Sequence, residues 1–150
     1  MLALDMYEHA YHIDHGAAAG AYVDAFMGNI RWERVYGRYQ AAVHAASQGA
    51  GCAPDQISDA QVLDVRRAAV HAQATEMLPG ARWCDPAEVS RWAAELDPGR
   101  QVVVYCVYGH DVGRSTALRL RAAGVNARFL EGGIDGWKAA GRPLSAKTAG

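Results

Sequence analysis

Residues 102–105 form an uninterrupted apolar run, Val-Val-Val-Tyr, that ends at Cys106. A loop with glycines follows, and a helical pattern begins near Arg114. A short apolar run bounded in this way is typical of a strand in a parallel sheet, buried on both faces. Backbone N–H groups of the loop and the positive end of the helix would then surround the Cys106 sulfur. Both favour a thiolate, so Cys106 is a candidate nucleophile; the alternative is a buried free cysteine at a strand end.

Strand and helix patterns alternate along the second part of the chain, residues 58–150. Short apolar strands are expected over 62–65 and 125–130. A helix that starts after Asp85 carries an apolar face, and a helix over 114–123 is ended by a glycine. This alternation predicts an α/β fold: a parallel sheet covered by helices on both faces.

The first part of the chain has a different pattern. Residues 1–48 read as wholly helical, with aromatic residues at helical spacing in a long helix over 31–46. Residues 49–57 are rich in glycine and small side chains, which indicates a linker. We therefore expect a helical appendage over 1–48, a linker over 49–57 and an α/β domain over 58–150.

Composition excludes several classes of partner. The 150 residues are 51% hydrophobic, enough for a real core, and carry a formal net charge of -1. This charge gives no reason to expect nucleic acid or membrane as a partner, and no apolar run is long enough to span a bilayer. The odd count of three cysteines fits a reducing cytoplasm. Cys52 is expected to be exposed in the linker, and Cys84 to be a small buried hydrophobe or a resolving thiol.

Four ordered motifs resemble the rhodanese (sulfurtransferase) family over about residues 61–144. They are Asp64-Val65-Arg66, then Leu78-Pro79-Gly80-Ala81, then the Cys106 loop, and last the stretch from Ala127 to Trp137 with Gly141-Arg142-Pro143-Leu144. The resemblance implies a rhodanese-like sheet and sulfurtransferase activity of the thiosulfate type. Sulfane sulfur would pass from a donor such as thiosulfate through a Cys106 persulfide to cyanide or a thiol, without metal or organic cofactor.

The expected site centres on Cys106 as the catalytic residue. The substrate-binding loop is expected to comprise Val107, Tyr108, Gly109, His110, Asp111, Val112, Gly113 and Arg114. His110 and Arg114 would attract an anionic donor while Asp111 opposes it, which predicts modest thiosulfate turnover; alternatively, His110 is a solvent-facing residue and Arg114 a brace. Asp64, Arg66 and Trp137 are expected to support the structure.

The N-terminal string Asp5-Met6-Tyr7-Glu8-His9-Ala10-Tyr11 resembles the C-terminal metal-ligand signature of Fe/Mn superoxide dismutases, over residues 1–45. By that resemblance Asp5 and His9 stand at two metal-ligand positions. Tyr7 and His12 depart from the family pattern, and the helices that carry the other two ligands of that family are not in this chain. We therefore expect no metal site, with Asp5 and His9 as vestigial candidates, and a possible homodimer through the N-terminal helices.

Other functions remain open at this point. The chain is alternatively a non-catalytic sulfur carrier, a redox sensor or a partner-binding module in oxidative stress. A cysteine-dependent phosphatase or arsenate reductase needs a Cys-x5-Arg loop, but Val112 stands six residues after Cys106 and Arg114 lies two further on. A residual metal-binding dismutase fragment is the last alternative.

Overall fold

A computed structural model of the chain describes residues 2–147. The chain divides into two compact units, Met1–Tyr39 and Gln40–Gly150. The division falls within helix α3, so the end of this helix belongs to the second unit. The helical first unit and the α/β second unit confirm the predicted fold class. Among the described residues, no helix is long and apolar enough to cross a membrane.

The first unit is a set of short helices. Its elements are the 3-10 turn η1 (Glu8–Ala10), α1 (His12–His15), α2 (Ala19–Gly28) and the start of α3 (Trp32–Ala46). Tyr11 and Tyr22 stack with ring centroids 5.0 Å apart. No residue among 2–39 is buried. Ile13 exposes 93% of its surface, and three aromatic residues of α3 expose 48% each: Trp32, Tyr36 and Tyr39. Residues 2–39 therefore form no buried core of their own.

The second unit is built on a five-stranded, all-parallel sheet of order β1-β6-β5-β2-β4. Its strands are β1 (Gly51–Cys52), β2 (Gln61–Asp64), β4 (Arg82–Trp83), β5 (Val102–Tyr105) and β6 (Ala127–Leu130). The central strand β5 pairs with β2 so that Asp64 lies opposite Tyr105. Because all strands point the same way, the segments that follow them meet at one edge of the sheet.

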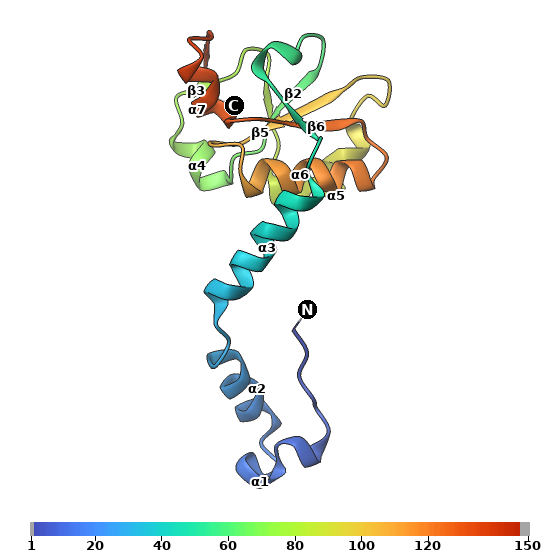
Figure 1. Cartoon of the computed structure of the whole chain (residues 1–150), viewed down its shortest axis with the longest axis vertical. Coiled ribbons are helices and arrows are strands. Elements are labelled where there is room, and N and C mark those ends of the chain that lie inside the picture. The colour runs from blue at the N-terminus through green and yellow to red at the C-terminus, as the bar shows by residue number, and fades with distance from the viewer. Residues whose placement is uncertain (1, 148–150) are drawn as a thin grey trace. The chain divides into compact units, whose positions relative to one another are not determined.

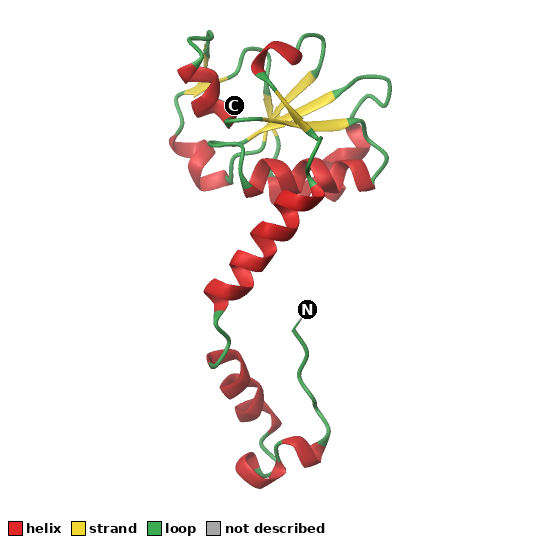
Figure 2. Cartoon of the chain, in the orientation of Figure 1, coloured by secondary structure: helices red, strands yellow, loops and turns green. Residues whose placement is uncertain are grey.

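Helices cover both faces of this sheet (Figures 1 and 2). One core contains Val102 and Val104 and is covered by α5 (Val89–Trp92) and α6 (Asp111–Ala122). The other contains Val103 and Tyr105 and is covered by α7 (Gly133–Ala139). Alternate residues of β5 thus enter opposite cores, which explains its continuous apolar run.

The remaining elements are short. Helix α4 (Ala68–Gln73) follows β2, and 3-10 turns lie at η2 (Pro54–Gln56), η3 (Pro86–Glu88) and η4 (Ala93–Glu95). Strands β3 (Glu76–Met77) and β7 (Ser145–Ala146) form a second, antiparallel sheet. This pairing ties the C-terminal segment to the stretch between α4 and β4.

Three local expectations need correction. Residues 49–57 are not a plain linker, because β1 lies within them and pairs with β6; Cys52 is 1% exposed rather than solvent-facing. The helix expected after Asp85 is divided into η3, α5 and η4, although the Asp85 carboxylate does cap its start by accepting from Ala87 N at 2.9 Å. Helix α6 begins at Asp111, three residues before the expected start.

Candidate active site

Cys106 follows the last residue of the central strand β5 and lies at the carboxyl edge of the sheet. The strands on either side, β6 and β2, end at this same edge. The residue is 6% exposed, so its side chain is largely covered. Ligands of parallel α/β sheets bind at this edge, where the loops after the strands meet.

The loop after Cys106 presents unsatisfied backbone donors. Within residues 2–147, no hydrogen-bond acceptor receives the amide N–H groups of Val107, Tyr108, Gly109 or His110. Gly109 adopts a φ of 70°, which turns the loop back toward α6. Because α6 starts at Asp111, its first turn and the positive end of its dipole also face this region. The loop is suited to hold negative charge.

Gly113 lies directly beside the sulfur. A Cβ atom built on Gly113 would be 3.4 Å from Cys106 Sγ, at ordinary contact distance. The residue is buried in the first turn of α6. Its missing side chain therefore leaves room next to the Cys106 sulfur.

The turn at Gly132-Gly133 and the start of α7 hold the Cys106 loop by backbone hydrogen bonds. Ile134 N donates to Cys106 O at 2.9 Å, and Asp135 N donates to Val107 O at 3.0 Å. A Cβ at Gly133 would lie 2.5 Å from both of these carbonyl oxygens, so only glycine fits this close approach. Two backbone hydrogen bonds thus fix the position of the residues on either side of the Cys106–Val107 peptide.

Arg114 braces the loop instead of facing solvent. Its Nε donates to Gly109 O at 3.2 Å, and its Nη1 donates to Ser47 Oγ at 3.0 Å. The guanidinium carbon lies 4.4 Å from the centre of the Phe129 ring. Of the two roles left open by the sequence, these contacts favour the brace over substrate attraction.

Two of the other loop side chains, Tyr108 and His110, are exposed, whereas Val112 packs against the core under α6. Tyr108 is 57% exposed, and its ring is 5.9 Å from that of His110, which is also exposed. The Asp111 carboxylate accepts a hydrogen bond from Gln40 Nε2 at 2.9 Å. The roles of these side chains with a substrate stay predictions.

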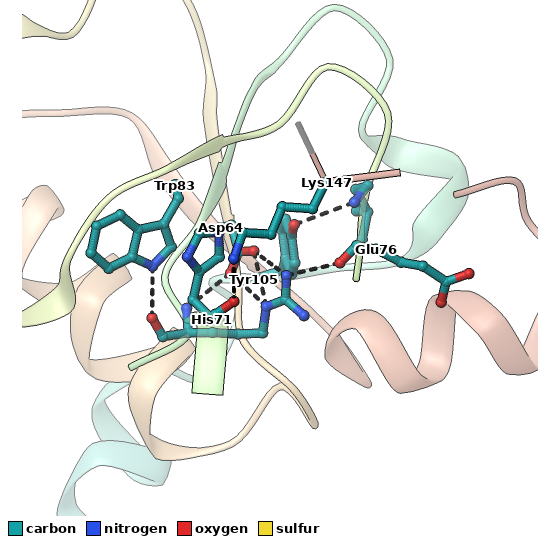
Figure 3. Close-up of polar contacts among 8 residues, drawn as sticks. Asp64, His71, Glu76, Trp83, Tyr105 and Lys147 are labelled. Carbon is teal, nitrogen blue, oxygen red and sulfur yellow. Dashed lines mark hydrogen bonds and ion pairs between the residues drawn. The ribbon is translucent and has the colours of Figure 1, made fainter. Parts of the chain in front are cut away.

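A buried polar network lies at the end of β2 (Figure 3). Arg66 Nε donates to both carboxylate oxygens of Asp64 at 2.9 Å, and Arg66 Nη2 donates to Asp64 and to Glu76 O. Asp64 is fully buried and Arg66 is 5% exposed. Leu78 N donates to the Tyr105 hydroxyl at 3.3 Å, and burial raises the pKa of Tyr105. Charge-assisted bonds of Arg66 join the end of β2 to β3, and the Leu78–Tyr105 hydrogen bond adds β5.

His71 and Trp83 adjoin this network, to which Trp83 is hydrogen-bonded through the backbone of Arg66 (Figure 3). Their rings stack with centroids 4.8 Å apart, while Trp83 Nε1 donates to Arg66 O at 2.9 Å. Lys147 Nζ donates to His71 O at 2.7 Å. His71 Nε2 is buried without a hydrogen-bond partner in the described chain, and burial lowers the pKa of this histidine.

The three cysteines occupy different surroundings, and all are free thiols. Burial raises the pKa of the Cys52 thiol to about 11, although Arg128 nearby lowers it in part, and its Sγ lies 3.4 Å from Phe129 O. Burial also raises the pKa of Cys84, which packs in the core under α5. Both thiols are therefore protonated near neutral pH and poor nucleophiles. Of the three cysteines, Cys106 alone is followed by the loop whose backbone N–H groups have no acceptor within residues 2–147.

The vestigial metal candidates lie in the first unit. Asp5 Oδ2 is 3.8 Å from His9 Nε2, and both side chains are more than half exposed. Across the described residues, no group of three or more His, Cys, Asp or Glu side chains is placed to hold a metal ion. Asp5 and His9 form an exposed pair, which is fewer ligands than the four of a structural metal site.

The second unit matches a known family. Residues 50–140, more than half of the chain, match the model of the rhodanese-like domain. The chain belongs to the rhodanese-like family. Its rhodanese-like unit is similar to a full-length protein from Lactobacillus plantarum, with 23% identity and a TM-score of 0.61 over 74% of this chain and 99% of that one.

A second solved structure carries a functional name. It is a thiosulfate sulfurtransferase from Pseudomonas aeruginosa, 24% identical with a TM-score of 0.55, over 63% of this chain and 19% of that protein. At these identities both structures show the shared rhodanese fold alone.

The first unit matches another family. Residues 1–38 match the C-terminal domain of iron/manganese superoxide dismutases. An iron superoxide dismutase from Cupriavidus metallidurans is 67% identical over 43 residues, which are 29% of this chain and 22% of that protein. The chain spans about a fifth of the length of the curated dismutases that it matches.

Some residues that shape the rhodanese-like site were not found from sequence. Gln40 of α3 and Ser47, which directly follows this helix, contact the site. They lie 71 and 67 residues in sequence from their partners Asp111 and Arg114. Glu76 and Lys138 form an ion pair between two other segments. Isolated polar residues in helical patterns give no local signal of such distant partners.

Proposed function

We propose that the rhodanese-like unit is a sulfurtransferase with Cys106 as its sulfur-carrying nucleophile. The support is the position of Cys106 at the carboxyl edge of the central strand, in front of a loop whose amides have no acceptor within residues 2–147. The family match supports the same reaction type, since it covers this loop.

The reaction has two balanced steps. The Cys106 thiolate attacks the outer sulfur of thiosulfate, a new S–S bond forms, and sulfite leaves with the electron pair of the broken S–S bond. An acceptor, cyanide or a thiolate, then attacks the outer sulfur of the Cys106 persulfide, and the bond to Cys106 breaks to restore the thiolate. The covalent intermediate divides one difficult transfer into two easier displacements.

The loop amides would stabilise the negative charge of thiolate and persulfide as a preorganised anion cradle. Gly113 leaves space next to Sγ, where the outer sulfur of a persulfide requires room. In this proposal neither a metal nor an organic cofactor takes part. The proposal also places the protein in a reducing compartment such as the cytoplasm, which agrees with three free cysteines.

Thiosulfate turnover is expected to be modest. The Arg114 guanidinium is bound to Gly109 O and Ser47 Oγ, and Asp111 adds negative charge to the loop. An anionic donor therefore meets few free cations at the loop itself. His110 is the exposed basic group left within it.

Steady-state formation of thiocyanate from thiosulfate and cyanide tests this function. Wild-type protein should turn over, Cys106→Ser should lose the activity, and Cys52→Ser should retain most of it because Cys52 is a buried, protonated thiol. Loss of activity in Cys52→Ser alone, with a normally folded protein, would contradict the assignment. No turnover by wild type with thiosulfate or 3-mercaptopyruvate would favour the binding-module alternative.

A further inference from the structure

A cavity of about 260 Å³ shares a wall with the Cys106 loop. The shared wall is Val107, the residue next to Cys106, whose carbonyl oxygen accepts from Asp135 N at the start of α7. The other walls come from α4, the stretch leading into β3, and α7. The polar and charged lining residues are Arg66, Gln73, Thr75, Glu76, Asp135 and Lys138. The active loop therefore has a polar cavity beside it.

The two cationic residues of the lining, Arg66 and Lys138, have capacity to bind an anion. Arg66 is 5% exposed, and its Nε and Nη2 are bound to Asp64 and Glu76 O, but its Nη1 has no acceptor among residues 2–147. Lys138 Nζ pairs with Glu76 Oε2 at 2.8 Å, and both side chains are 47% exposed. Exposed ion pairs contribute little free energy, so Lys138 can exchange this partner for a ligand carboxylate at low cost.

The two acidic residues of the lining, Asp135 and Glu76, can bind a cationic group. The Asp135 carboxylate makes no hydrogen bond or ion pair with the described part of the chain. Glu76 is released for a ligand whenever Lys138 takes another partner. Two cationic and two anionic groups thus line one small cavity, an arrangement that complements a zwitterion rather than a simple anion.

The size of the cavity also limits its ligand. Pockets for drug-sized molecules measure roughly 300 to 1,000 Å³, so about 260 Å³ suits a molecule of amino-acid size. A ligand held here lies against the residue that follows Cys106. Cys106 itself does not line the cavity, so an acceptor held here would reach the Cys106 persulfide from beside Val107.

We propose that this cavity binds the sulfur acceptor, and that the acceptor is an amino-acid-type thiol such as cysteine. Its carboxylate would lie near Lys138 and Arg66, and its ammonium near Asp135 and Glu76. Its thiolate attacks the outer sulfur of the Cys106 persulfide, which yields the acceptor persulfide and the Cys106 thiolate; the thiol proton goes to solvent. This inference rests on the proposed sulfurtransferase function.

Single-turnover transfer from sulfur-loaded protein tests the inference. Protein loaded with thiosulfate and then desalted is mixed with one of four thiols, and loss of the extra sulfur is followed by mass spectrometry. Cysteine has both charges, 3-mercaptopropionate only the carboxylate, cysteamine only the ammonium, and 2-mercaptoethanol neither. Each variant is compared with wild type for the same thiol, so differences in thiol nucleophilicity cancel.

Lys138→Met should slow transfer to cysteine and 3-mercaptopropionate about fivefold, and leave cysteamine and 2-mercaptoethanol unchanged within about twofold. Asp135→Asn should instead slow sulfur transfer to cysteine and cysteamine. Lys138→Arg keeps the positive charge, so it should transfer sulfur to all four thiols at rates close to those of wild type. Arg91→Met, which removes an exposed charge from α5 on the opposite face of the sheet, is the matched control. Equal effects on all four thiols, no effect on any, or slower loading from thiosulfate in Lys138→Met would overturn the inference.

Equilibrium binding separates this inference from the proposed function. S-methylcysteine keeps both charges but accepts no sulfur, and calorimetry should show that wild type binds it more tightly than Lys138→Met does. Failure to load Cys106 together with such binding would refute the sulfurtransferase function and the acceptor role, but not the zwitterion site. Normal loading without charge-dependent transfer or binding would refute the site and leave the function standing.

Discussion

Gly133 is the residue on which the geometry of the Cys106 loop depends most strictly. Its φ is 58°, and a Cβ at this position would lie 2.5 Å from the carbonyl oxygens of Cys106 and Val107. The turn it permits brings two backbone donors onto those same oxygens. Conformation and close approach therefore require glycine independently of each other.

Gly133→Ala should destabilise the protein by about 3 kcal/mol or more, because the new methyl group must displace the loop. Gly141→Ala is the matched control: Gly141 also has a positive φ of 66°, but nothing lies within 4 Å of its Cβ position. The control should cost only about 1 kcal/mol from backbone strain. Urea unfolding of both variants measures the difference, and equal losses would contradict the steric argument.

The cysteines should differ in reactivity. Near pH 7, iodoacetamide should alkylate Cys106 in the native protein and leave Cys52 unmodified, since burial raises the pKa of Cys52 to about 11. Peptide mapping after brief labelling measures each site, and labelling in denaturant shows that all three thiols can react. Preferential alkylation of native Cys52 would contradict this order of reactivity.

At the scale of elements, the Cys106 loop is held by two segments that are far apart in the sequence, the start of α7 and the residues that follow α3. The start of α7 binds its carbonyls, while Arg114 of α6 joins it to Ser47 after α3. On the outer side, α4 and β4 are joined by the stacked rings of His71 and Trp83. This second contact is sensitive to protonation, because His71 Nε2 is buried without a partner within residues 2–147.

We expect the free energy of unfolding to fall as pH drops below about 6.5. Burial lowers the pKa of His71 in the folded chain; Lys147 and Arg66 lower it further, and Asp64 opposes this in part. In the window between the lowered folded pKa and the ordinary unfolded pKa, the unfolded chain binds a proton that the folded chain does not. Protonation therefore favours unfolding, and the stabilisation by neutral His71 is complete only above that window.

Chemical unfolding of His71→Gln at several pH values checks this expectation. The variant should lose part of the pH dependence between about 6.5 and the lower folded value, whereas the control His44→Gln, at an exposed position of α3, should retain all of it. An identical slope in wild type and His71→Gln would mean that other groups cause the pH dependence.

The sequence predicts the long elements of the sheet and misses the short ones for physical reasons. The strand over 102–105 agrees with the structure because its apolar run reflects burial on both faces. Strand β1 has only two residues and the composition of a turn; it forms because β6 pairs with it. The early start of α6 escapes detection because a glycine such as Gly113 is typical of a loop, whereas here Gly113 is buried in the first turn of the helix, beside the Cys106 sulfur.

In the site, too, the residues in local motifs can be predicted from sequence, and those that depend on distant partners cannot. Cys106 and the glycine turn are visible in local motifs, whereas the partners of Arg114 and the lining of the cavity arise from segments that meet only in three dimensions. From sequence, Arg114 is predicted either to bind the substrate or to brace the loop. Its contact with Ser47, which directly follows α3 and is assigned from sequence to the helical appendage, distinguishes the two roles.

At the scale of the whole molecule, the functional boundary of the rhodanese-like unit lies inside α3. Val43 and Ser47 are buried, and Gln40 and Ser47 bind Asp111 and Arg114. The residues before Gln40 bury none of their side chains within the described part, and they match about a fifth of a dismutase. The last turns of this helix thus complete the α/β unit.

Two truncations test this boundary. Removal of residues 1–39 should leave the unfolding midpoint of the rhodanese-like unit nearly unchanged, whereas removal of residues 1–48 should lower its stability by about 2–3 kcal/mol through loss of Val43 and the Ser47 hydrogen bond. Urea unfolding of both fragments measures this. Equal stability of the two would contradict the assignment of α3 to the α/β unit.

The homodimer expected through the N-terminal helices stays a prediction. Sedimentation of the whole chain beside residues 40–150 examines it directly. A dimer that depends on residues 1–39 would support it, and a monomeric whole chain would refute it.

The central claim is that Cys106 carries sulfur, and the most direct measurement is the mass of the intact protein before and after thiosulfate, with peptide mapping of the product. The account predicts a gain of one sulfur atom, located on Cys106, removed by cyanide and absent from Cys106→Ser. A gain located on Cys52 or Cys84, or no gain with any sulfane donor, would contradict it.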